Sequence, residues 1–167
     1  MLKKKIIDIL NEQVEKEGYS SNLYLAMATW AEANGYAGIA GWLYAQSEEE
    51  RMHMLKFIHY INERGGHAIV PAFKVAPKDQ KGIRPMFEEI LKHEQFISES
   101  INNIVALAID EKDFTTQSWI QWFVNEQIEE ESQVTEILDK LKLLGDNNLY
   151  LFDRDIMSLR AADNQTK

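Results

Sequence analysis

Two sets of three possible metal ligands are related by one constant offset along the chain. Adding 77 to each position of the first set gives the positions of the second set. The same offset takes Trp42 to Trp119 and Glu49 to Glu126, so the register extends beyond the ligands. Solvated surface charge does not produce such a repeat, and the pattern predicts a helical hairpin used twice, with a two-metal site between the copies. The two sets are Glu17, Glu50 and His53, and Glu94, Gln127 and Glu130.

The composition favours one mostly helical domain. The 167 residues are 45% hydrophobic, which is enough to bury one sizeable core. The chain has only eight glycines and three prolines, and it lacks closely spaced turn signals. We therefore expect an all-α fold that forms a single domain over residues 1–167, with a four-helix bundle at about residues 5–144.

Charge and cysteine content exclude several classes of protein. A net charge of -9 opposes non-specific binding to nucleic acid or to anionic membranes. No apolar run reaches the roughly 18 residues of a membrane span, and residues 1–5 are followed by amphipathic sequence rather than a signal peptide, so we expect a cytoplasmic protein. The absence of cysteine excludes disulfides and iron–sulfur clusters, so any metal must be held by oxygen and nitrogen ligands.

Four long amphipathic patterns and one short pattern run along the chain. Asn34-Gly35, Gly65-Gly66 and Gly145 mark the ends of three of them. The short pattern must cover an apolar surface, either on its own bundle or on another chain. The expected helices are residues 5–34, 38–64, 84–111, 114–144 and 148–160, followed by a mobile tail at 161–167.

Connection lengths predict the topology. The first and second helices are joined by a few residues and must be antiparallel, and the same holds for the third and fourth. Residues 66–82 form a longer connection of 17 residues, which spans up to about 56 Å when extended. A helix over 38–64 is about 40 Å long, so the connection can cross the full length of the bundle. The third helix then begins parallel to the second.

The two hairpins bring the possible ligands to one height. Folding the first hairpin at its turn places Glu17 opposite His53, and folding the second places Glu94 opposite Glu130. The third ligand of each set lies three residues before His53 or Glu130, on the same helix face. Unpaired carboxylates on apolar stripes would cost several kcal/mol each, and two divalent cations would balance four of them. Oxygen-rich ligation with one imidazole suits iron or manganese.

With these residues in place, the chain resembles the bacterial non-haem ferritins, within the ferritin-like di-iron carboxylate proteins. The resemblance covers nearly the whole sequence. It implies a ferritin-like four-helix bundle with a long crossover between the second and third helices and a short fifth helix at the C-terminal end. The residues that carry it are Glu17, Tyr24, the run 49–53, Glu94, Trp122 and the run 125–131.

The resemblance also implies the role of each ligand. One iron ion would be held by Glu17, Glu50 and His53. A second would be held by Glu94 and Glu130, with Glu50 bridging the two ions and Gln127 beside the pair. A third site, toward the interior of a shell, would consist of Glu49, Glu126, Glu129 and Glu130. Without the resemblance, the acidic residues of this third set have the pattern of a hydrated helix face.

The function implied by the resemblance is iron storage with ferroxidase activity. Fe²⁺ would be oxidised by dioxygen or hydrogen peroxide and deposited as a ferric mineral inside a hollow shell of 24 chains, whose fifth helices surround the four-fold axes. Iron is then both site metal and substrate. Tyr24 is a candidate electron donor, with Trp122 a weaker one, although Tyr24 is equally suited to packing in the core. Two alternatives are a redox enzyme that retains two iron or manganese ions and a metal-free structural bundle.

Two departures from related families narrow the expectation. Bacterioferritins and rubrerythrins carry a second E-x-x-H motif, and here the matching positions run from Gln127 to Glu130 without a histidine. The haem methionine of bacterioferritins follows the bridging glutamate, whereas Arg51 follows Glu50 here. We therefore expect no haem.

Overall fold

The computed structural model describes residues 1–145 and 148–163, and it contains five helices and no strand in these ranges. None of the described helices is long and apolar enough to cross a membrane. The predicted all-α fold is confirmed. The fifth helix continues to Asp163, three residues beyond its predicted end, and residues 164–167 of the predicted tail lie outside the described ranges. The helices are α1 (Lys4–Ala33), α2 (Ala37–Glu63), α3 (Ile83–Asp110), α4 (Phe114–Leu144) and α5 (Leu149–Asp163).

The two hairpin turns use related backbone conformations. After α1, Gly35 has a φ of 85°, and the Tyr36 amide donates to the carbonyl of Ala31. This left-handed residue ends the helix, as is common for glycine. After α3, Lys112 takes the same role with a φ of 54°, although it is not a glycine. Lys112 lies 77 residues after Gly35, so the repeat seen in the ligands also extends to the turns.

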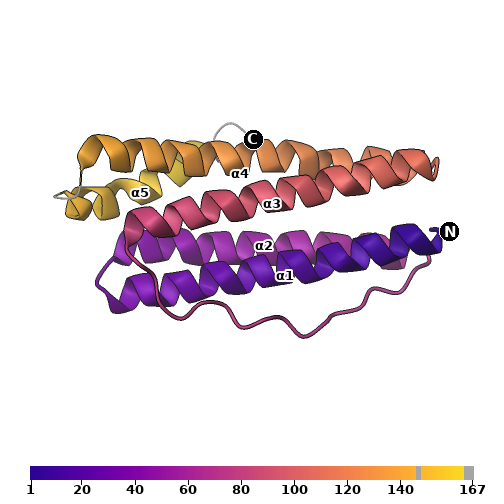
Figure 1. Ribbon diagram of the computed structural model, residues 1–167, viewed down its shortest axis with the longest axis horizontal. Helices are drawn as coiled ribbons and strands as arrows, with labels where there is room; N and C mark the ends of the chain where they lie inside the picture. Colours follow the sequence, from indigo (N-terminus) through magenta and orange to yellow (C-terminus); the bar gives the residue numbers. More distant parts are fainter. Residues whose placement is uncertain (146–147, 164–167) are drawn as a thin grey trace.

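The connection between α2 and α3 runs along the whole bundle, as its length predicted (Figure 1). It is held to α1 by Asn11, whose Oδ1 accepts a hydrogen bond of 2.7 Å from the Ile69 amide. The Phe73 ring lies so close to Gly18 of α1 that a Cβ there would come within 2.3 Å of it. Because of this crossover, α3 runs parallel to α2.

A polar layer divides the core into two apolar clusters. One cluster lies near the α1–α2 turn and includes Trp42 and Phe87, and the other lies near the start of α1 and includes Phe57 and Ile101. In each of the four long helices, the residues of the predicted site lie between these two clusters. The apolar ends therefore stabilise the bundle, and the polar middle is left for the site.

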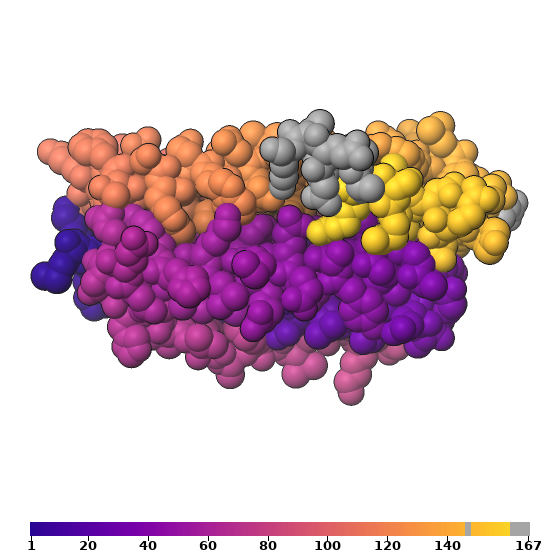
Figure 2. All heavy atoms as spheres, turned by 180° about the vertical axis from the view of Figure 1, so that it is seen from behind, coloured from indigo at the N-terminus to yellow at the C-terminus, as the bar shows by residue number. Residues whose placement is uncertain are grey.

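The short helix α5 packs against its own bundle (Figure 2). Phe152 and Ile156 are buried in the cluster near the α1–α2 turn. Asp153 accepts a hydrogen bond of 2.8 Å on its Oδ1 from the Ile39 amide at the start of α2. Gly38 allows this approach, because a Cβ there would lie 1.7 Å from the Asp153 carbonyl oxygen. Of the two surfaces that the sequence left open for α5, the bundle surface is therefore occupied.

Candidate metal centre

The middle layer of the bundle contains four carboxylates and one imidazole. All four long helices contribute, because α1, α3 and α4 each carry one of these residues on the buried face and α2 carries two. Every one of the side chains is at most 3% exposed. Such a concentration of buried acid is costly unless cations or protons neutralise it. The residues are Glu17, Glu50, His53, Glu94 and Glu130.

Glu17, Glu50 and His53 form a compact group in which one potential ligand atom of each residue lies within 4.8 Å of the others. His53 Nδ1 is 3.6 Å from Glu50 Oε2 and 4.0 Å from Glu17 Oε2. Glu17 Oε2 and both carboxylate oxygens of Glu50 are buried without a hydrogen-bond partner. Buried oxygens are rarely left unpaired, so these three are suited to bind a metal ion.

Burial also shifts the protonation of this group when no metal is bound. It raises the pKa of Glu17 well above the ordinary value, and the charge of Glu50 adds to the effect. Burial likewise raises the pKa of Glu50 well above the ordinary value, with a further contribution from Glu94. The cause is the same in both cases, since a low-dielectric interior disfavours the ionised carboxylate. A divalent cation would reverse the preference and release the protons.

Glu94 and Glu130 form the other half of the layer, and both receive hydrogen bonds. The Tyr24 hydroxyl donates to Glu94 Oε1 at 2.5 Å, and Gln127 Nε2 donates to Glu94 Oε2 at 3.1 Å. Burial raises the pKa of Glu94, and these two donors partly offset it. Gln46 Nε2 donates to Glu130 Oε2 at 2.8 Å, while burial and Glu94 raise the pKa of Glu130 well above its ordinary value.

Gln127 lies beside the carboxylates, where the repeat predicted it. Its amide nitrogen also donates to the backbone carbonyl of Glu94 at 3.2 Å. With its nitrogen directed at Glu94, Gln127 orients that carboxylate. A role as a direct metal ligand stays a prediction.

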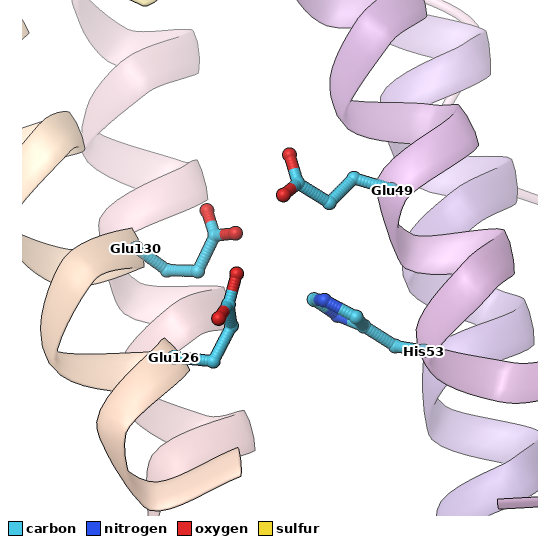
Figure 3. A group of neighbouring side chains, drawn as sticks. All are labelled: Glu49, His53, Glu126 and Glu130. Carbon is cyan, nitrogen blue, oxygen red and sulfur yellow. The ribbon is translucent and has the colours of Figure 1, made fainter. Parts of the chain in front are cut away.

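A second group lies at the seam between α2 and α4 and shares His53 and Glu130 with the buried layer. Glu49 and His53 of α2 point toward Glu126 and Glu130 of α4, and their ligand atoms lie within 4.8 Å of one another (Figure 3). Three members of the predicted third site are therefore brought together, and His53 joins them. Glu129 is exposed and lies outside both groups. Its role as a ligand also stays a prediction.

An open depression of about 400 Å³ leads to this second group. Its lining includes His53, Glu49 and Glu126, and also Trp122 and Arg160. His53 therefore contributes to the Glu17 and Glu50 group and to the wall of the depression. His53 is thus the residue that the buried group with Glu17 and Glu50 shares with the lining of the depression.

The two aromatic candidates for electron transfer lie in different surroundings. Tyr24 is 1% exposed and packs edge-on against Trp42, with ring centroids 6.3 Å apart. Burial raises the pKa of its phenol well above 10.0, and the charge of Glu94 adds to this. Trp122 is 39% exposed, and its ring lies 5.5 Å from that of His53. Tyr24 thus has both a packing role and a direct hydrogen bond to a candidate ligand.

Sequence reasoning missed three residues that support the ligands. Gln13 donates to Glu17 Oε1 at 2.8 Å and accepts from Ser100 at 2.6 Å. Gln46 supports Glu130, and Arg160 donates to Glu49 Oε2 at 2.5 Å. A usable signal was present for the two glutamines, because each lies four residues before a predicted ligand on the same apolar stripe.

Comparisons with known proteins agree with this geometry. A family model for a ferritin-like domain matches residues 7–144. The bacterial non-heme ferritin of Campylobacter jejuni is 40% identical over 161 residues, which cover 95% of this chain and 96% of that protein. The bacterial non-heme ferritin of Staphylococcus saprophyticus is 38% identical over 158 residues, covering 93% of this chain and 95% of that protein.

Solved structures give the same result. An open pore ferritin from the hyperthermophilic archaeon Archaeoglobus fulgidus superposes with a TM-score of 0.91 at 34% identity, covering 93% of this chain and 96% of that one. The resemblance inferred from the ligand motifs is therefore confirmed over almost the full length. With a matching family model, relatives above 30% identity and a buried carboxylate layer between two apolar clusters, the chain belongs to the ferritin family.

Proposed function

We propose that this chain oxidises Fe²⁺ at a dinuclear centre in the middle of its bundle and stores the product as a ferric mineral inside a hollow shell. Membership in the ferritin family supports iron storage. The observation that carries the ferroxidase part is the set of three buried, unpaired carboxylate oxygens on Glu17 and Glu50, beside His53. Such oxygens are suited to hold a hard cation.

The proposed ligand roles follow from position and charge. Glu17 and His53 hold one Fe²⁺, and Glu94 with Glu130 holds the other. Glu50 is the proposed bridge, because both of its carboxylate oxygens are buried without a hydrogen-bond partner and are therefore available to two ions. Four carboxylates supply four negative charges, which two Fe²⁺ ions neutralise. Iron is here a substrate that passes through the site.

The proposed chemistry is a two-electron transfer. Two Fe²⁺ ions each lose one electron, and dioxygen takes up two electrons and two protons to give hydrogen peroxide. Where hydrogen peroxide is the oxidant, it takes up two electrons and two protons to give two water molecules. The Fe³⁺ ions then leave through the group formed by Glu49, His53, Glu126 and Glu130, with the exposed Glu129 as an outer ligand.

A shell of 24 chains is the proposed assembly. Its support is the close likeness in fold to the archaeal ferritin, over 93% of this chain. At 19.4 kDa for each chain, the particle would have a mass of about 470 kDa without mineral.

The test is to add a large excess of Fe²⁺ to the metal-free protein in air and to measure the iron that co-elutes with it on a sizing column. We expect many more than about three iron ions per chain, in a particle of the size of a shell. About two ions per chain in a small oligomer would instead identify an enzyme that retains its metals. No bound iron would leave a structural bundle.

A matched pair of variants locates the oxidation step. Glu50→Gln removes the charge of the bridging residue while keeping its shape, and it should abolish rapid Fe²⁺ oxidation. Glu63→Gln removes a charge from the same helix at an exposed position outside the depression and should oxidise iron like the wild type. Equal oxidation rates in both variants would contradict the dinuclear assignment.

A further inference from the structure

Arg160 of α5 reaches into the group at the α2–α4 seam. Its Nη2 donates a hydrogen bond of 2.5 Å to Glu49 Oε2. Its Nη1 donates to Oε1 of the buried Gln46. The Nε2 of the same Gln46 side chain donates to Glu130 Oε2 at 2.8 Å. One guanidinium therefore contacts Glu49 directly and Glu130 through an amide, which are two of the four residues of the group.

The position of Arg160 is fixed by the packing of its helix. Phe152 and Ile156, on the preceding turns of α5, are buried in the bundle core. Asp153 accepts a hydrogen bond from the Ile39 amide, and Gly38 lets the two backbones approach. The Arg160 side chain is itself only 18% exposed. Its contacts are therefore those of an anchored helix, and the planar fork of the guanidinium suits two acceptors at once.

We propose that Arg160 is a positioning residue that competes with the iron ion for Glu49. It thereby keeps the metal occupancy low in the group formed by Glu49, His53, Glu126 and Glu130, which we call the inner group. This inference rests on the proposed function, because it concerns the route by which Fe³⁺ leaves the dinuclear centre. A cation can be bound by all four residues of the inner group only after the guanidinium has released Glu49 Oε2. The guanidinium also repels the incoming cation, since both are positive.

The consequence is passage of iron rather than retention. Without Arg160, three carboxylates and one imidazole would form a strong site for a hard cation. With Arg160 bound to Glu49, the same group binds a cation more weakly, and the ion moves on through the depression that Arg160 lines. In the absence of metal, Arg160 neutralises part of the acidic charge and keeps Glu49 in place.

The test measures metal affinity at the inner group with Zn²⁺, which undergoes no oxidation. The variants are Arg160→Gln, which removes the charge, and Arg160→Lys, which keeps the charge but cannot contact Glu49 and Gln46 as a fork. Calorimetric titration gives the affinities, and anomalous scattering at the zinc edge assigns each ion to the inner group or to the centre at Glu17 and Glu50. We expect Arg160→Gln to bind Zn²⁺ at the inner group about tenfold more tightly than the wild type.

Arg160→Lys should fall between the wild type and Arg160→Gln, because it retains the repulsion without the paired contacts. The matched control is Arg154→Gln on the same helix, where Arg154 forms an ion pair with the adjacent Asp155 at the surface. This variant should leave both zinc affinities unchanged. If Arg160 had a purely structural role, Arg160→Gln would lower the unfolding temperature without tightening zinc binding.

Two results would overturn the inference, and they differ in what they say about the proposed function. If Zn²⁺ binds at the centre formed by Glu17 and Glu50 while its affinity at the inner group is equal or weaker in Arg160→Gln, Arg160 does not compete with metal and the dinuclear assignment stands. If the wild-type chain binds zinc at neither place, the proposed function and the inference both fail.

Discussion

At the residue scale, Tyr24 has surroundings that suit a coupled transfer of an electron and a proton. Burial and the charge of Glu94 raise the pKa of its phenol, so the hydroxyl keeps its proton in the resting protein. That proton already lies on a 2.5 Å hydrogen bond to Glu94 Oε1. Loss of an electron from the ring would make the phenol strongly acidic, and Glu94 is placed to accept its proton.

We predict that Tyr24→Phe abolishes a tyrosyl radical formed during aerobic Fe²⁺ oxidation and slows the oxidation. The ring and its packing on Trp42 are kept, so the variant should fold. Loss of the hydrogen bond to Glu94 should cost about 1–3 kcal/mol of stability in the metal-free protein. Freeze-quench electron paramagnetic resonance measures the radical.

The control is Tyr44→Phe, which removes a 2.7 Å hydrogen bond to the exposed Glu32. Wild-type kinetics in Tyr24→Phe, with no radical in either protein, would leave Tyr24 only a packing role.

The candidate ligands could be picked out from the sequence because the repeat marks them, whereas the repeat does not mark the residues that support them. The offset of 77 residues takes Gln13 to Ile90 and Gln46 to Phe123, so neither glutamine has a polar counterpart in the other hairpin. Gln46 lies on the same helix as Glu50, yet its amide supports Glu130 on α4. Such a hydrogen bond depends on how two helices face each other, and that geometry cannot be read from the amino-acid sequence alone.

At the element scale, the turn between α3 and α4 contains a correctable strain. Lys112 adopts a φ of 54° at the position that the repeat relates to Gly35. A left-handed conformation costs an ordinary L-residue about 1–2 kcal/mol, part of which glycine recovers despite its greater freedom in the unfolded chain. We predict that Lys112→Gly raises the unfolding free energy by about 0.5–1 kcal/mol in urea denaturation. Lys112→Ala, which keeps a Cβ, should give no such gain, and equal stability of the two variants would contradict the strain.

Alanine substitutions at two glycines of α2 should have opposite effects on the docking of α5. A Cβ at Gly38 would lie 1.7 Å from the Asp153 carbonyl oxygen, which is backbone and cannot rotate away. A Cβ at Gly41 would meet only the Met157 sulfur, at 3.6 Å. Gly38→Ala should therefore displace α5 and lower stability by about 1–3 kcal/mol. Gly41→Ala should be neutral or stabilising by up to about 1 kcal/mol, because alanine favours a helix.

Hydrogen exchange of the α5 amides distinguishes these outcomes. Exchange should become faster in Gly38→Ala and stay unchanged in Gly41→Ala. The same protection of α5 in both variants would mean that its contact with α2 does not depend on close backbone approach. Loss of this contact should also release Arg160 from Glu49, so zinc affinity at the inner group gives a second readout of the same change.

Helix boundaries were predictable where glycine or a short turn sets them, and less so for α5. The four long helices begin and end within one residue of the expected positions. The apolar pattern stops at Leu159 and predicts an end of α5 at residue 160, but the helix continues to Asp163. Ala161 and Ala162 sustain a helix by intrinsic preference without any apolar periodicity. The partner of α5 was likewise open, since an amphipathic helix does not specify which apolar surface it covers.

At the scale of the whole molecule, stability is tied to the protonation of the buried layer. Glu17, Glu50 and Glu130 have pKa values raised well above the ordinary 4.5, chiefly by burial. Between 4.5 and the raised values, the folded chain binds more protons than the unfolded chain, so stability falls as pH rises. His93 opposes this trend at lower pH, because burial lowers its pKa from 6.5 to about 4. Above pH 6.5 the carboxylates alone set the slope among these groups.

We predict that the unfolding free energy of the metal-free protein decreases from pH 6.5 to pH 8 and that saturating Zn²⁺ removes this dependence. The metal displaces the excess protons, so folded and unfolded states then bind equal numbers of them in this range. Zinc at about 100 times its dissociation constant should also add about 2.7 kcal/mol of stability per site. Thermal unfolding with and without a chelator at the two pH values tests both effects. Glu50→Gln should flatten the slope of the metal-free protein, because a neutral amide has no proton to lose. An equal slope with and without zinc would show that the buried carboxylates do not bind the metal in exchange for protons.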